Sequence, residues 1–141
     1  MGIFVANCQC NNPLAECFDE AANRFWHDAE TLCTAGRLAA ADHLYGLSAE
    51  CALKAIITHE CGGMRKQDKV HLPCIWDEFL QHPNNSLAQS TSANPFNGTW
   101  CIEHRYAADQ HFIQPRLEKH RAGANEANKL LEQSKINGQI P

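Results

Sequence analysis

An arginine and a histidine stand six positions apart in the stretch HRYAADQHF, which joins Arg105 to His111. A histidine near neutral pKa can move protons, and a guanidinium can stabilise negative charge that grows on phosphate oxygens. Together these groups can bind a phosphate and move a proton beside it. Supporting side chains stand beside them: His104, Tyr106 and Asp109. This is the densest cluster of titratable and hydrogen-bonding side chains in the chain.

The spacing itself has little specificity, because short patterns recur by chance. It occurs three times in this chain: Arg37 to His43, Arg65 to His71, and Arg105 to His111. The first pair stands at the head of a buried helix, and the second spans a charged linker that gives no fixed geometry. The third pair follows a long polar loop, and its setting favours it as the candidate catalytic pair.

The most regular helical pattern covers residues 38–57 (LAAADHLYGLSAECALKAII), which lack proline and are rich in alanine and leucine. Its polar stripe repeats every fourth residue: Asp42, Gly46, Glu50 and Lys54. The rest of the circumference is apolar or small, so we expect this helix to be mostly buried. Glu50 and Lys54 have the spacing of a helix-surface ion pair, and a supporting contact from Glu50 to Arg105 is the alternative.

The other elements expected from the pattern are also helical. A helix over 24–35 precedes the central one and ends at Gly36, and the lead-in after Pro13 either forms a short helix or runs straight into it. Later helices are expected from Pro73 to Leu80 and from Trp100 to about Ile113, separated by a long loop at 82–99, and a last one continues beyond Pro115. We therefore predict an all-α, four- to five-helix up-and-down bundle, with a lead-in at 1–23, a helical domain at 24–133 and a tail at 134–141.

A pair of predicted helices is followed along the chain by the Arg–His stretch. Paired helices in FWHDAETLCTAGRLAAADHLYGLSAECALKAII include the segment A-E-x-x-L-K at Ala49–Lys54, and HRYAADQH follows. In this order they resemble the HEPN superfamily, a small all-α domain of many prokaryotic RNases and toxin–antitoxin systems, over about residues 24–133. The resemblance implies a metal- and cofactor-independent RNA endonuclease that works as a homodimer, with Arg105 and His111 of both subunits meeting at the interface. Tyr106 departs from the smaller polar residue that the family often carries there.

Composition limits how RNA could be held. The 141 residues are long enough for one domain with its own core, and their net charge is −4. This balance excludes a protein that coats nucleic acid, which needs a concentrated basic face. It allows local phosphate contacts, and the basic turn with Arg116, Lys119 and Arg121 is the candidate RNA-binding run. No secretory signal or membrane span is recognisable, so we expect a cytoplasmic protein with reduced cysteines.

Three alternatives remain open. A HEPN-like subunit can lack catalysis and bind a nucleotide, an antitoxin or a nucleotidyltransferase-type partner. A Cys/His metal site would use Cys8, Cys10, Cys17 and His27, although their spacing lacks the paired knuckles of structural zinc sites. A Cys–His hydrolase would pair Cys101 with His104, without any recognisable nucleophile elbow.

Overall fold

Four α-helices build the part of the chain, residues 16–138, that this computed structural model describes. They are α1 (Phe18–Thr34), α2 (Leu38–Glu60), α3 (Cys74–Gln81) and α4 (Gln114–Ile136). Four short 3-10 helices connect them: η1 (Lys66–Asp68), η2 (Ala88–Ser90), η3 (Ile102–Tyr106) and η4 (Asp109–His111). Within residues 16–138 there is no β-strand, so the all-α class is confirmed.

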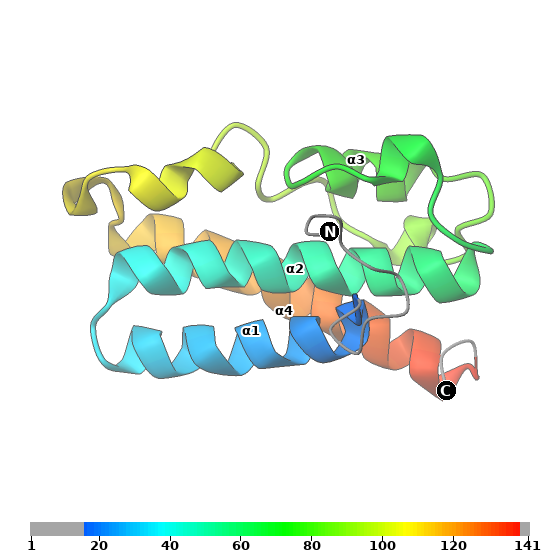
Figure 1. The fold of residues 1–141 in the computed structure, drawn as a ribbon, viewed down its shortest axis with the longest axis horizontal. Coiled ribbons are helices and arrows are strands. Elements are labelled where there is room, and N and C mark those ends of the chain that lie inside the picture. The colour runs from blue at the N-terminus through cyan, green and yellow to red at the C-terminus, as the bar shows by residue number, and fades with distance from the viewer. Residues whose placement is uncertain (1–15, 139–141) are drawn as a thin grey trace, which may run out of the picture.

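Helices α1 and α2 form an antiparallel hairpin, and α4 lies behind it, packed mainly along α2 (Figure 1). The hairpin turns at Gly36, whose φ of +77° suits a residue without a side chain. Helix α1 begins at Phe18, six residues before the expected start at Arg24, so the lead-in runs straight into it. Helix α4 likewise continues to Ile136, beyond the expected domain end at residue 133.

Helix α2 is the centre of the bundle, as its thin polar stripe predicts. Even the four stripe residues are buried: Asp42, Gly46, Glu50 and Lys54. The Lys54 Nζ lies 3.0 Å from a Glu50 carboxylate oxygen, so the expected pair forms, although both side chains lie in the interior rather than on the surface. Helix α3 packs on the far end of α2, close to the expected position after Pro73.

The helix expected from Trp100 to Ile113 does not form, and this prediction is wrong. The segment instead contains η3 and η4, separated by extended backbone at Ala107 and Ala108 (ψ 158° and 145°). Its ends are fixed by the buried rings of Trp100 and Phe112. Helix α4 begins only at Gln114, with Pro115 in its first turn, where a proline costs no hydrogen bond.

Trp100 is the main anchor of this segment on the central helix. Its indole N–H donates to the Asp42 backbone oxygen at 3.2 Å, and its ring stacks on His43 at 5.5 Å between centroids. The indole occupies the space above Gly46, where a Cβ atom would lie only 2.0 Å from a ring carbon. Gly46 therefore leaves the space on the surface of α2 that the Trp100 indole occupies.

We expect Gly46→Ala to destabilise the protein by about 1–3 kcal/mol, because the added methyl overfills a closed contact. In an exposed helix the same change would instead stabilise by up to about 1 kcal/mol. Urea unfolding followed by circular dichroism measures the difference, and loss of the Trp100 environment appears in near-ultraviolet spectra. A Gly46→Ala protein more stable than the wild type would show that the Trp100 indole does not fill the space above Gly46.

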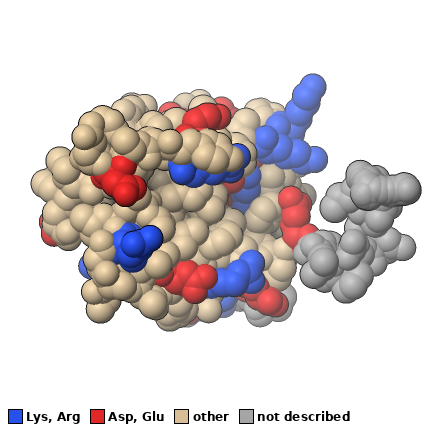
Figure 2. Space-filling model, turned by 60° about the vertical axis from the view of Figure 1, so that its left-hand side comes forward, with Lys and Arg blue, Asp and Glu red and all other residues tan. Residues whose placement is uncertain are grey.

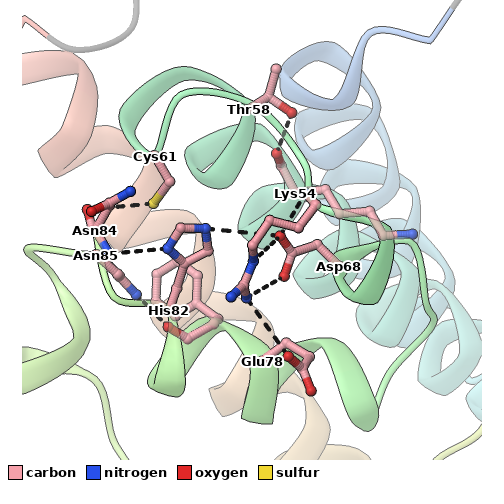
Figure 3. Close-up of polar contacts among 10 residues, drawn as sticks. Lys54, Thr58, Cys61, Asp68, Glu78, His82, Asn84 and Asn85 are labelled. Atoms are coloured by element: carbon pink, nitrogen blue, oxygen red, sulfur yellow. Dashed lines mark hydrogen bonds and ion pairs between the residues drawn. The ribbon is translucent and has the colours of Figure 1, made fainter.

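The two members of the second Arg-x5-His pair make separate structural contacts. Arg65 closes on Asp68 with two guanidinium hydrogen bonds of 2.8 and 2.9 Å, and this pairing lowers the pKa of the Asp68 carboxyl. His82 lies beside the same carboxylate, and its Nδ1 accepts from the Asn84 N–H (Figure 3). His71 contacts Glu50 instead, so this pair does not share one site.

Candidate functional site

A surface pocket of about 620 Å³ lies at the end of the bundle where α1 turns into α2. One wall is the start of α2, and the other is the segment that carries η3 and η4, which lies over it (Figure 1). The chemically capable side chains that line it are Arg37, His43, His104, Arg105 and Asp109. Two arginines and two histidines thus line one pocket, although they come from parts of the chain about sixty residues apart.

His43 is the residue that the structure adds to the expected site. Burial is the main cause that lowers its pKa below the ordinary value of 6.5, and the positive charge of Arg105 lowers it further. Its Nδ1 is buried without a hydrogen-bond partner among the described residues. A histidine with a lowered pKa is unprotonated at neutral pH and can accept a proton. The only sequence signal for it was the Arg37 to His43 spacing.

We expect Arg105→Ala to raise the pKa of His43, because the substitution removes a nearby positive charge that disfavours the imidazolium. Burial remains, so the pKa should stay below 6.5. Titration of the His43 ring protons by NMR in both proteins measures the shift, with the exposed His27 as internal reference. A His43 pKa that is unchanged or lower in the variant would show that Arg105 does not act on the ring.

His104 is held by its Nδ1 atom. The Arg116 Nη2 lies 2.9 Å from this nitrogen, and the Cys101 backbone N–H donates to it at 3.3 Å. The ring therefore turns its Nδ1 edge to the protein and leaves Nε2 without a partner among the described residues. This geometry also bears on the Cys–His alternative, since Nδ1 meets the backbone of Cys101 rather than forming a bond with its thiol.

The expected catalytic pair is only partly brought together. Arg105 lines the pocket, whereas His111 lies in η4 and is not among the pocket-lining residues. Both side chains are exposed, and Arg105 lies 5.0 Å from the centroid of the Tyr106 ring, which is 81 % exposed. Asp109 is also exposed and lines the pocket. Within one chain, His43 and His104 thus line the same pocket as Arg105, whereas His111 does not.

The basic turn of α4 does not form a free RNA-binding face. Arg121 makes two hydrogen bonds of 2.7 and 2.8 Å to Glu30, whose pKa it lowers to about 2. Arg116 turns inward to Asp42 and His104. Lys119 is exposed. Two of the three expected phosphate contacts are therefore used within the fold.

Glu50 has partners other than Arg105. Its carboxylate accepts from Lys54 and from the Leu72 backbone N–H at 3.1 Å, and it lies 2.9 Å from the His71 Nδ1. These contacts tie the linker before α3 to the middle of α2. In the described part of the chain, no hydrogen bond or ion pair joins Glu50 to Arg105, so the alternative of a supporting contact is not observed.

A buried carboxylate joins the site to the core. Asp42 Oδ1 lies 2.6 Å from His120 Nδ1, and His120 Nε2 lies 2.9 Å from the Thr99 hydroxyl. This order of groups matches a nucleophilic triad in form. However, Asp42 and His120 are at most 1 % exposed, and Thr99 does not line the described pocket. We interpret the three groups as a structural clamp between α2, α4 and the loop before η3.

The metal alternative finds no support within residues 16–138, where no group of three His, Cys, Asp or Glu side chains could hold an ion. Cys8 and Cys10 lie outside the described residues, so their part of the prediction stays open. The six described cysteines have free thiols. Burial raises the pKa of the Cys51 thiol to about 12, as expected for a small apolar residue in a helix.

The pocket is a local feature rather than part of a broad charged surface. Figure 2 turns this end of the bundle toward the viewer and shows Lys, Arg, Asp and Glu side chains interspersed over the visible face.

Among the described helices, none combines the length and apolar character needed to cross a membrane. Comparison with protein-family models, curated proteins and solved structures finds no match to this chain.

Proposed function

We propose that this protein is a metal-independent RNA endonuclease of HEPN-like type, which binds one phosphodiester in the pocket at the α1–α2 turn. The observation that carries the proposal is the meeting of Arg37 and Arg105 with two histidines in one pocket. Guanidiniums suit phosphate oxygens, and a histidine of lowered pKa suits proton abstraction. No metal is required for this chemistry.

The reaction would proceed by transfer within the RNA. His43 takes the proton of the 2′-hydroxyl, and the 2′-oxygen forms a bond to phosphorus as the bond to the 5′-oxygen breaks. The leaving 5′-oxygen takes a proton from water, and the products are a 2′,3′-cyclic phosphate and a 5′-hydroxyl. Arg37 and Arg105 stabilise the charge on the phosphorane oxygens, which is greater in the transition state than in the substrate.

The homodimer and the toxin–antitoxin setting that the resemblance implies are part of the same proposal. A homodimer could bring His111 of a second copy to the pocket, and a toxin–antitoxin setting would supply a protein partner in the cytoplasm. The alternative function is binding of RNA or a nucleotide without cleavage. Asp109 does not separate the two functions, because a carboxylate on the pocket wall opposes the approach of any phosphate, cleaved or merely bound.

Incubation of the purified protein with end-labelled RNA in the presence of a chelator tests the proposal. We expect fragments that carry 2′,3′-cyclic phosphate and 5′-hydroxyl ends. Cleavage that requires added metal would contradict the mechanism. Saturable binding of RNA or nucleotide without any cleavage would favour the binding subunit instead, and size-exclusion chromatography with light scattering determines whether the active species is a dimer.

A further inference from the structure

We propose that Arg116, anchored by the buried Asp42, is a positioning residue that holds His104 as its Nε2–H tautomer, with this N–H presented to an oxygen of the bound phosphate. The identity of the acceptor rests on the proposed function. The tautomer rests on geometry alone and can be measured separately. Arg116 thereby gains a role that differs from the direct RNA contact expected of it.

The contacts at Nδ1 determine where the ring carries its proton. A guanidinium and a backbone amide can only donate hydrogen bonds. Both reach the same atom, from Arg116 at 2.9 Å and from Cys101 at 3.3 Å, so Nδ1 must accept. An imidazole that accepts at Nδ1 carries its proton on Nε2. Since His104 lines the pocket and the protein occupies its Nδ1, we infer that this N–H is the ring donor available to the site.

Asp42 determines where the guanidinium lies. Its Oδ2 is 3.5 Å from the Arg116 Nε, and its side chain is 1 % exposed. The Arg116 guanidinium also lies 5.5 Å from the centroid of the buried Phe112 ring. A charge partner on one side and an aromatic ring nearby restrict the guanidinium, so its Nη2 stays directed at His104. The Asp42 carboxylate also contacts His120, and this second contact fixes the position of the carboxylate.

The arrangement gives the two pocket histidines different tasks. In the proposed reaction His43 acts in proton transfer, whereas His104 is committed as a hydrogen-bond donor. A fixed neutral N–H near a phosphate oxygen stabilises developing charge without giving up its proton. Such a donor needs no reorganisation during the reaction, because Arg116 has already oriented it.

NMR of ¹⁵N-labelled full-length protein tests the tautomer directly. We expect the His104 Nδ1 resonance at the position of an unprotonated nitrogen and the Nε2 resonance at that of a protonated one, at neutral pH and without RNA. A proton on Nδ1 in the wild-type protein overturns the inference, whether or not the protein cleaves RNA. Absence of RNA cleavage together with the Nε2–H tautomer would contradict the proposed function only.

Two variants separate a positioning role from a merely structural one. In Arg116→Met we expect a mixture of His104 tautomers and a kcat for RNA cleavage reduced about tenfold to a hundredfold, with KM nearly unchanged. The exposed Lys129→Ala on the same helix should leave both readouts at the wild-type level. Arg116→Lys keeps the charge and should retain more of the Nε2–H form than Arg116→Met. A variant Arg116→Met that is folded and keeps the wild-type tautomer overturns the inference.

Discussion

If the protein cleaves RNA as proposed, we expect Arg105→Ala to lower kcat by about a hundredfold to a thousandfold, which is the loss that follows when one donor to a charged transition state is removed. The fold itself should be unaffected, because Arg105 is exposed and its guanidinium lies over the exposed Tyr106 ring. Rates measured on end-labelled RNA, together with thermal unfolding of the same samples, separate the loss of chemistry from a loss of structure.

Arg24→Ala is the matched control, since Arg24 is exposed on α1 and lies over the Phe25 ring in the same manner. His43→Ala should reduce kcat to a similar extent as Arg105→Ala. His111→Ala should change the rate only a few fold if the pocket of a single chain performs the chemistry. A large loss in His111→Ala with little loss in His43→Ala would instead place the working histidine on a second copy.

Asp42→Ala lowers the free energy of unfolding by about 3–5 kcal/mol, because it removes one partner of a buried ionic network and leaves the others unpaired. The carboxylate contacts His120 at 2.6 Å and Arg116 at 3.5 Å, and both contacts are lost in the variant, whereas the Asp42 backbone oxygen that accepts from Trp100 is retained. Asp42→Asn should cost less, since an amide oxygen can still accept from His120. Urea denaturation of the three proteins gives the free energies.

The exposed Asp28 on α1 supplies the control for Asp42, and Asp28→Ala should change the stability by less than about 0.5 kcal/mol. A loss below about 1 kcal/mol in Asp42→Ala would show that the buried network is not held together by this carboxylate. A loss in Asp42→Asn as large as in Asp42→Ala would show that charge, rather than hydrogen bonding to His120, is the larger contribution.

The sequence allows the scaffold to be predicted well where local pattern and packing agree. The stretch 38–57 has helical periodicity, good helix formers and a glycine pair beyond its end, and α2 follows it closely. The prediction of a helix over residues 100–113 was wrong, because alanines such as Ala107 and Ala108 favour a helix locally. Burial of Trp100 and Phe112 at its two ends overrides that preference, and no local signal reveals such long-range anchoring.

The spatial neighbours of Arg105 could not be predicted for the same reason. Its setting in the sequence favoured Arg105, which lines the pocket, but the residues on the opposite wall come from the start of α2. Spacing along the chain linked Arg105 to His111, while the fold brings it to His43. The basic run was misjudged because the partners of Arg116 and Arg121 lie on α2 and α1, which no inspection of α4 alone could show.

The indole seated above Gly46 has a thermodynamic consequence for the pocket. One wall belongs to the bundle, and the other belongs to a segment that must lie against α2 before any pocket exists. Segment release is therefore a local opening reaction, with a free energy of its own below that of global unfolding. An anion that bridges Arg37 and Arg105 binds only the closed form and shifts this equilibrium toward it. Amide hydrogen exchange in η3 and η4 thus reports pocket occupancy, independently of whether anything is cut.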